Sequence, residues 1–222
     1  MRNYIYQDNL SFKDKVLSFD YLLIFLILLL GIISFFAMYS TESGNFGYYT
    51  KSHIYRFCVF FTIFFVISVI KIQFWHKSSY LFYFGVLILL FAVDFFGITA
   101  SGSKRWINLF IFNLQPSELM KVALIIFLAR YYDKIPSHEA NNFRYMFIPI
   151  FALLIPVSLI ITQPDLGTAV LVGIGGIAVI WMVGFRMKYF IYSMMIFVCL
   201  TPVAIAFLKP YQKSRILTFF NP

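Results

Sequence analysis

The chain has 222 residues, of which 61% are hydrophobic and only 12% are charged. A water-soluble domain carries about 25% charged residues, so this composition excludes an ordinary soluble enzyme or binding module and indicates a chain surrounded by lipid. The net charge is +9. In such a chain a positive charge is typical of Lys and Arg at helix ends, and it gives no support for a nucleic-acid partner.

Seven apolar stretches predict membrane-spanning helices, each of which needs about 20 residues. They cover residues 21–40, 53–70, 79–99, 117–130, 145–162, 166–184 and 189–208. The predicted fold class is therefore all-α, a polytopic membrane helix bundle. Residues 1–19 are predicted to form a cytoplasmic N-terminal segment, and residues 20–209 the transmembrane helical domain.

The Lys and Arg residues give a predicted orientation, because short loops rich in them face the cytoplasm. With a cytoplasmic N-terminus, ten of the 18 lie inside, seven lie outside and Lys121 falls within a span. This bias favours the N-terminus inside. The outer cations, which run against the rule, indicate an anionic partner on that side; they are Lys51, Arg56, Lys104, Arg105, Lys209, Lys213 and Arg215.

One stretch between two spans, residues 101–121 (SGSKRWINLFIFNLQPSELMK), concentrates polar side chains. Polar groups at a bilayer are costly, so such a cluster is a candidate site. We expect its outer loop and the following helix start to contact or line a site for a ligand. The candidate residues are Lys104, Arg105, Trp106, Gln115, Ser117, Glu118 and Lys121.

Two features of this stretch each have two interpretations. Glu118 and Lys121 are three residues apart, share one helix face and are expected to pair. They form either a structural ion pair or the lining of a polar cavity in which Lys121 meets a ligand phosphate. Trp106 is either an interfacial anchor or, with Arg105, part of a clamp for a diphosphate and its attached sugar or isoprenoid.

A second motif, Gln163-Pro164-Asp165-Leu166-Gly167, repeats the pattern of Gln115-Pro116-Ser117-Glu118. Proline suits the first turn of a helix, and an acid there is favoured by the helix dipole. Both motifs are therefore predicted to start helices at the outer face. Gln163 and Asp165 join the candidate site, whereas Pro116, Pro164 and Gly167 are expected to be structural.

Three further features concern packing and metal binding. Asp94 lies within a span and is predicted to be structural, with a cation from Lys104–Arg105 as its partner. Ala169 and Gly173 have the small-xxx-small spacing of closely packed helices. The three histidines and two cysteines do not resemble a metal site, and the sequence itself indicates no cofactor.

Three motifs in this order and spacing, Gly102-Ser103-Lys104-Arg105-Trp106-Ile107, Gln115-Pro116-Ser117-Glu118 with Lys121, and Gln163–Thr168, resemble the SEDS family (shape, elongation, division and sporulation). The resemblance is closer to the branch for rod shape than to the branch for cell division. It implies a ten-helix fold in the bacterial cytoplasmic (inner) membrane and a peptidoglycan glycosyltransferase that polymerises lipid II at the outer face. It also implies a class B penicillin-binding protein as partner and, by analogy, a divalent cation.

The chain departs from the family pattern at its end. The family places its proposed catalytic Asp in a large outer loop, which only begins here, at residues 210–222, so this Asp is expected beyond Pro222. We therefore assign no catalytic residue within the chain. We expect the chain to be the N-terminal part of such an enzyme and to be inactive on its own. Two alternatives stay open: a flippase for lipid-linked precursors, separable by a liposome flipping assay, and an inactive scaffold that co-purifies with a penicillin-binding protein.

Overall fold

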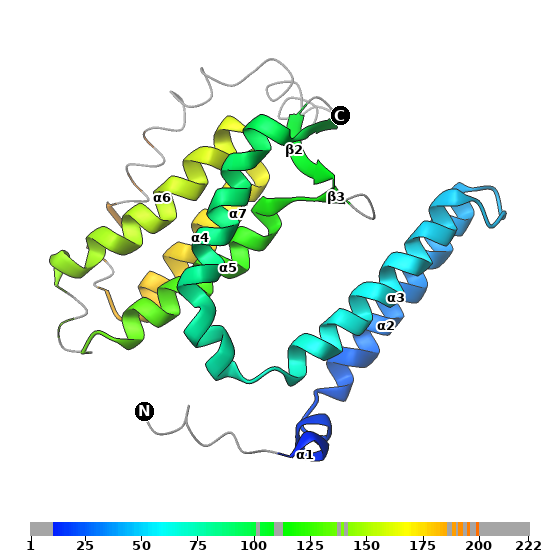
Figure 1. Ribbon diagram of the computed structural model, residues 1–222, viewed down its shortest axis with the longest axis horizontal. Coiled ribbons are helices and arrows are strands. Elements are labelled where there is room, and N and C mark those ends of the chain that lie inside the picture. Colours follow the sequence, from blue (N-terminus) through cyan, green and yellow to red (C-terminus); the bar gives the residue numbers. More distant parts are fainter. Residues whose placement is uncertain are drawn as a thin grey trace. The chain divides into compact units, whose positions relative to one another are not determined.

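The computed structural model describes residues 11–100, 103–108, 113–136, 139 and 142–185, together with 188, 189, 191, 192, 195 and 199. This part is mainly helical, as predicted (Figure 1). Its helices are α1 (Phe12–Leu17), α2 (Tyr21–Thr41), α3 (Tyr48–Val69), α4 (Ile72–Phe96), α5 (Pro116–Asp133), the 3-10 helix η2 (Phe143–Met146), α6 (Phe147–Thr162) and α7 (Leu166–Met182).

The first six predicted spans correspond to α2 to α7. The main differences are at starts: α3 begins at Tyr48 and α4 at Ile72, because helical hydrogen bonding continues through polar residues such as Lys51 and Lys77 that end an apolar run. Within the described residues, four helical stretches are long and apolar enough to cross a membrane: Tyr21–Thr41, Tyr48–Val69, Ile72–Phe96 and Arg144–Thr162.

The C-terminal predictions are not tested by the structure. Most of the seventh predicted span and all of residues 210–222 lie outside the described residues. The start of a large outer loop at residues 210–222, and a catalytic Asp beyond Pro222, therefore stay predictions based on the family resemblance.

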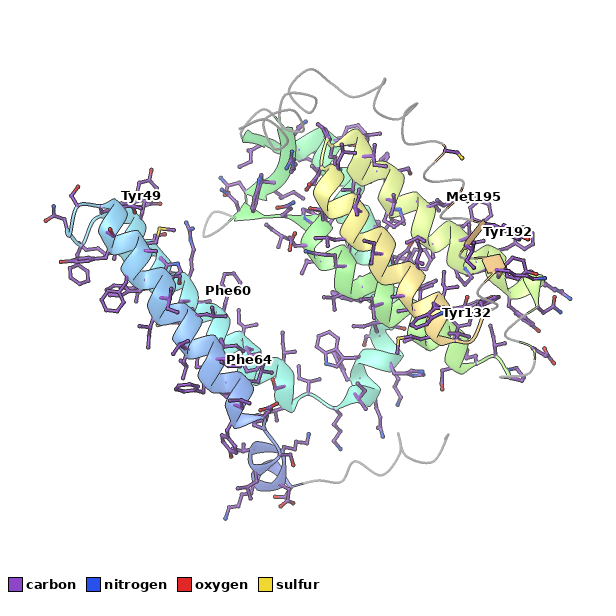
Figure 2. All side chains as sticks on the ribbon, turned by 180° about the vertical axis from the view of Figure 1, so that it is seen from behind. Tyr49, Phe60, Phe64, Tyr132, Tyr192 and Met195 are labelled. Carbon is purple, nitrogen blue, oxygen red and sulfur yellow. The ribbon has the colours of Figure 1, made fainter. Side chains whose placement is uncertain are left out.

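The chain divides into two compact units, residues 1–77 and 78–222. In the first unit, α2 and α3 pack side by side as a hairpin. The exposed faces of this hairpin are apolar: α2 buries no residue, α3 buries only Thr50, and rings such as Tyr49 and Phe60 project outward (Figure 2). A helix that is apolar all round suits lipid tails and does not suit water.

Main-chain groups at the ends of this hairpin are satisfied by side chains. The carboxylate of Glu42 accepts hydrogen bonds from the N–H of Tyr49 (3.0 Å) and of Thr50 (2.9 Å), and from the Thr50 hydroxyl. This caps α3, whose N-cap residue Gly47 has no side chain to do so. The Thr50 hydroxyl lowers the pKa of Glu42 and so favours its ionised form. At the other end, Lys15 Nζ donates to the carbonyl of Val69 (2.8 Å), the last residue of α3.

In the second unit, the segment between α4 and α5 contains a small antiparallel sheet with the order β1-β2-β3. The strands are β1 (Ile98–Ala100), β2 (Ser103–Asn108) and β3 (Asn113–Leu114). The prediction that Lys104, Arg105 and Trp106 occupy a loop is therefore wrong, because they form the middle of β2. The alternation of side chains along a strand sends Lys104 and Arg105 to opposite faces.

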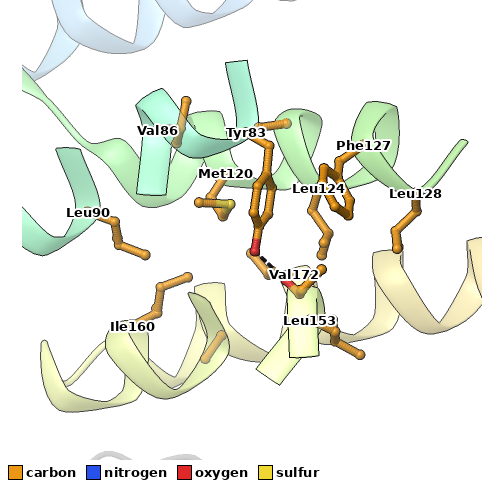
Figure 3. Close-up of a cluster of buried hydrophobic side chains, with 13 residues drawn as sticks. Tyr83, Val86, Leu90, Met120, Leu124, Phe127, Leu128, Leu153, Ile160 and Val172 are labelled. Carbon is orange, nitrogen blue, oxygen red and sulfur yellow. Dashed lines mark hydrogen bonds between the residues drawn. The ribbon is translucent and has the colours of Figure 1, made fainter. Parts of the chain in front are cut away.

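The core of the second unit is built by α4, α5, α6 and α7, with buried residues such as Leu90, Leu124, Leu153 and Val172 (Figure 3). Gly176 of α7 faces the side chains of α5 and α6. A Cβ there would lie 2.6 Å from Leu153 Cδ1 and 3.0 Å from Leu124 Cδ2, so a larger residue would require these leucine side chains to move.

The small-residue prediction for α7 is half correct. Ala169 is buried, but a Cβ on Gly173 would meet nothing within 4 Å. The buried face instead runs through Ala169, Val172, Gly176 and Ile180, which follows the helical period of 3.6 residues.

A proline inside α6 is matched by a buried tyrosine from α4. Pro156 has no N–H, so the carbonyl four residues earlier, that of Ala152, lacks its helical donor. The hydroxyl of Tyr83 donates to this carbonyl oxygen at 2.8 Å, across 69 residues of sequence (dashed line in Figure 3). In a lipid-surrounded bundle such a group must be satisfied internally, so Tyr83 makes Pro156 tolerable.

We predict that Tyr83→Phe lowers the free energy of unfolding by about 1–3 kcal/mol, the cost of leaving a buried acceptor unsatisfied. In a Pro156→Ala background the new main-chain N–H at position 156 would serve the carbonyl of Ala152, so the same change should cost much less. Denaturation of the four purified proteins in mixed micelles measures this coupling. Tyr55→Phe, on an exposed ring of α3, is the control. Equal costs in both backgrounds would contradict the pairing.

Candidate functional site

Lys104 on β2 caps the end of α4. Its Nζ donates to the carbonyl oxygens of Asp94 (2.7 Å) and Phe95 (3.2 Å) in the last turn of that helix. These are among the carbonyls that no residue further along the helix can satisfy, and a cation there is also favoured by the helix dipole. The amine therefore fixes β2 to α4.

Arg105, the next residue, reaches the start of α7. Its Nη2 donates to the carbonyl of Pro164 (2.8 Å), and its Nη1 lies 3.6 Å from Oδ1 of Asp165. The side chains of Arg105 and Asp165 are 20% and 10% exposed, respectively, so this ion pair is largely shielded. Two adjacent residues of one strand thus hold the end of one helix and the beginning of another.

Asp165 is the N-cap of α7 and has further donors around its carboxylate. Thr168 contributes its N–H to Oδ1 (3.3 Å) and its hydroxyl to Oδ2 (2.9 Å). Gln115, the N-cap of α5, donates through Nε2 to Oδ2 of Asp165 (2.8 Å) and to Oγ of Ser117 (3.0 Å). We call Arg105, Gln115, Ser117, Asp165 and Thr168 the Asp165 network.

The Asp165 network joins β2, α5 and α7 through one buried anion. Taken as whole residues, Ser117, Asp165 and Thr168 are 3%, 8% and 8% exposed. Sequence reasoning grouped four of these five residues but missed Thr168 as a site residue. The sequence signal for Thr168 was its position three residues after the N-cap Asp165, because the main-chain N–H at that position donates to the capping carboxylate.

Gln163 forms a second link, from the α6–α7 turn to α4. Its Nε2 donates to the carbonyl of Leu90 (2.8 Å) and lies 3.3 Å from Oδ1 of Asp94. The prediction that a cation from Lys104–Arg105 pairs with the Asp94 carboxylate is therefore wrong. Lys104 instead donates to main-chain carbonyls at the end of α4, and the side-chain amide of Gln163 donates to the carboxylate of Asp94.

The ion pair expected from sequence spacing is present. Lys121 Nζ and Glu118 Oε2 lie 2.7 Å apart in the first turns of α5, and the two side chains are 30% and 53% exposed. Trp106 is half-buried and lies opposite Ile98 in the sheet. These three residues have surface open to a ligand, whereas the Asp165 network is largely enclosed.

The expected structural residues behave differently from one another. Pro116 is the first residue of α5, as predicted. Pro164 precedes the N-cap Asp165 and so lies before the first turn of α7, not in it; the capping carboxylate defines that helix start instead. Gly167 has open space around the position of a Cβ.

The donor set decides what chemistry these residues can support. The carboxylate of Asp165 accepts three hydrogen bonds, two from Thr168 and one from Gln115, and lies beside the guanidinium of Arg105, so it is engaged as a structural anion. The described residues include no group of three or more His, Cys, Asp or Glu side chains that could hold a metal. Asp165 is engaged by neighbouring donors and Glu118 by Lys121, so the described part of this site offers no cluster of free carboxylates of the kind that a divalent cation prefers.

Comparison with known proteins supports this architecture. The fold and the motifs place the chain in the class of polytopic helical membrane proteins. The family model for FtsW, RodA and SpoVE, described as "Cell cycle protein", matches residues 17–222. The chain belongs to this family, which is the SEDS family identified from the motifs.

Relatives from both branches of the family match with the same identity. The "Probable peptidoglycan glycosyltransferase FtsW" of Buchnera aphidicola subsp. Schizaphis graminum is 31% identical, over 79% of this chain and 49% of the relative. The "Peptidoglycan glycosyltransferase MrdB" of Helicobacter pylori is also 31% identical, over 92% of this chain and 54% of the relative. The chain therefore spans about half the length of the curated relatives it matches.

Solved structures confirm the fold. A structure described as "Structural coordination of polymerization and crosslinking by a peptidoglycan synthase complex" matches with a TM-score of 0.78 and 26% identity, over 93% of this chain and 60% of that chain. The crystal structure of the rod shape determining protein RodA D255A mutant of Thermus thermophilus matches with a TM-score of 0.69 and 22% identity, over 83% and 60%.

We predict that Asp165→Asn lowers the free energy of unfolding by about 3–5 kcal/mol, because it leaves the shielded guanidinium of Arg105 uncompensated. Glu118→Gln, which breaks the exposed pair, should cost only about 0–1 kcal/mol. The double variant Arg105→Gln/Asp165→Asn should lose less than the sum of its single changes. Denaturation in mixed micelles measures these values; additive losses would refute the pairing.

Proposed function

We propose that the chain forms part of a RodA-like peptidoglycan glycosyltransferase, which joins lipid II units into glycan strands for cell elongation and shape. The observation that carries this proposal is the family match over residues 17–222, together with relatives that bear the name peptidoglycan glycosyltransferase. The site would face the outside of the bacterial inner membrane, with the N-terminus in the cytoplasm.

A second candidate is an FtsW-like role in cell division. The chain is 31% identical both to an FtsW and to an MrdB, which supports the division role and the elongation role alike. For either role we propose a penicillin-binding protein as partner, supported by the match to a structure described as a complex that coordinates polymerisation and crosslinking.

The chemistry of this reaction assigns different tasks to the site residues. A sugar hydroxyl attacks an anomeric carbon and a lipid diphosphate leaves, so the departing charge needs cations positioned near it. Lys121, with 30% of its side chain exposed, is the cation we propose for contact with the diphosphate. Glu118 orients that amine, and Trp106 offers a ring face to the sugar or isoprenoid.

The enclosed residues have a positioning role in this proposal. Arg105, Gln115, Ser117 and Asp165 hold the starts of α5 and α7 relative to β2, and Lys104 and Gln163 hold α4. Because α5 carries Lys121, errors in this framework would move the amine that meets the diphosphate. We propose that the general base is supplied by the family's outer-loop Asp, which we expect beyond Pro222 and outside this network.

The test is a gel assay of fluorescent lipid II polymerisation. We expect no polymer from the 222-residue chain alone, and polymer from a chimera in which it replaces the matching part of the Helicobacter pylori MrdB. In the chimera, Lys121→Gln should lower the rate by about 10²-fold, the usual cost of losing a charge-stabilising donor. Lys71→Gln, at an exposed lysine just before α4 on the predicted cytoplasmic side, is the matched control.

Three outcomes would count against parts of this proposal. Polymer from the isolated chain would refute the need for further residues. A chimera that makes no polymer but still scrambles lipid-linked precursors in liposomes would favour a flippase, whether it is the parent or the Lys121→Gln variant. Rescue of cells depleted of FtsW, but not of cells depleted of RodA, would assign the division role.

A further inference from the structure

Two cations of α3 have no role in the sites described so far. Among the seven cations predicted to lie outside, Lys104 and Arg105 hold helix ends, and three lie in the C-terminal segment outside the described residues. Lys51 and Arg56 remain, and both side chains are exposed on α3. Within the described part of the chain, neither side chain makes a hydrogen bond or an ion pair.

Arg56 lies inside the span, whereas Lys51 lies in its first turn, where water can reach it. α3 has 22 residues and is therefore about 33 Å long, close to the thickness of the hydrocarbon core, about 30 Å. Arg56 follows the first residue, Tyr48, by eight positions, so its Cα lies about 12 Å along the helix. A charge at this depth is costly unless an anion or a polar headgroup compensates it.

The direction of α3 brings the Arg56 side chain toward the nearer membrane surface. Cα–Cβ bonds tilt toward the N-terminus of a helix, and α3 begins at the turn that joins it to α2. Ser52 and Tyr49 precede Arg56 by four and seven residues and share its helix face. The exposed ring of Tyr49 marks this end of α3 (Figure 2). A long arginine side chain can therefore raise its guanidinium to the level of these two hydroxyls while its stem stays on apolar surface.

The acid near this helix end is engaged elsewhere. The carboxylate of Glu42 accepts hydrogen bonds from the N–H of Tyr49 and from the N–H and hydroxyl of Thr50. Thr50 is buried and precedes Arg56 by six residues, which separates the two by about 120° around the helix. Glu42 therefore caps α3 and leaves the charge of Arg56 to another anion.

Apolar side chains follow Arg56 toward the membrane centre. Val59, Phe60 and Ile63 come three, four and seven residues later and are all exposed, with the Phe60 ring pointing away from the hairpin (Figure 2). A partner helix with an acidic side chain would pack best against small residues, which let two backbones approach closely. These bulky side chains favour acyl chains instead. The face of α3 is thus polar at headgroup level and apolar below it, as a phospholipid is.

We propose that Arg56, together with Ser52 and Tyr49, binds the phosphate of an anionic phospholipid whose acyl chains lie along the apolar residues that follow. The planar guanidinium can donate two parallel hydrogen bonds to phosphate oxygens, and the two hydroxyls are further donors on the same face. With the N-terminus in the cytoplasm, as the Lys and Arg residues predict, this lipid belongs to the outer leaflet. The site does not require the proposed glycosyl transfer.

The experiment measures lipid retention by native mass spectrometry. The full 222-residue chain is released from nanodiscs that contain phosphatidylglycerol and phosphatidylcholine. We expect selective retention of phosphatidylglycerol, and about fivefold weaker retention in Arg56→Gln, as expected for the loss of one basic residue near the surface. Lys51→Gln is the matched control and should retain the lipid as the parent does. It removes the same charge from the same end of α3, but about 140° around the helix from Arg56.

Further arms separate the possible results. Arg56→Lys keeps the charge but loses the planar fork, so retention between that of the parent and that of Arg56→Gln supports a bidentate contact. Unchanged retention in folded Arg56→Gln, or an equal loss in Lys51→Gln, would overturn the site. Displacement of the lipid by an equimolar polyisoprenyl diphosphate, or by millimolar inorganic phosphate, would overturn the assignment to a phospholipid. Circular dichroism confirms that each variant is folded.

Discussion

Main-chain carbonyls without a helical partner are the constraint on which this structure depends. Within lipid no solvent hydrogen bond is available, so a carbonyl there must find a donor in the protein, and carbonyls at helix ends are commonly capped by side chains as well. In the second unit, long-range side chains provide these donors: Tyr83 serves the carbonyl freed by Pro156, Lys104 serves the end of α4, and Arg105 serves Pro164 before α7. In the first unit Lys15 does the same for α3.

This constraint explains why the most conspicuous cations of the sequence are not all open to a ligand. Lys104 and Arg105 are neighbours on β2, yet each is committed to a different helix end. The buried carboxylate of Asp165 then links the starts of α5 and α7 to the same strand. What stays accessible is the Glu118–Lys121 pair with Trp106, and the framework determines where that pair lies.

Local patterns in the sequence predicted local structure well. Apolar runs located α2 to α7, the three-residue spacing predicted the Glu118–Lys121 pair, and Pro116 marked the start of α5. The failures concern contacts between distant residues. Pro156 signals a freed carbonyl at Ala152, but nothing local shows that a donor 69 residues earlier satisfies it.

The same limit explains the errors at β2 and Asp94. The polar residues of β2 suggested a loop, although the strand pairs with β1 and β3 on either side. For Asp94, charge alone favoured a cation as partner, but the main-chain carbonyls at the end of α4 compete for that cation.

Hydrogen–deuterium exchange of Lys104→Met and Arg105→Gln tests most directly whether β2 holds two helix ends separately. Our account predicts that Lys104→Met speeds exchange in the last turn of α4 and leaves the amides of Thr168 and Ala169 unchanged. Arg105→Gln should do the reverse. If both variants loosened both helix ends alike, or neither loosened any, the two side chains would not be separate caps and the account would be wrong.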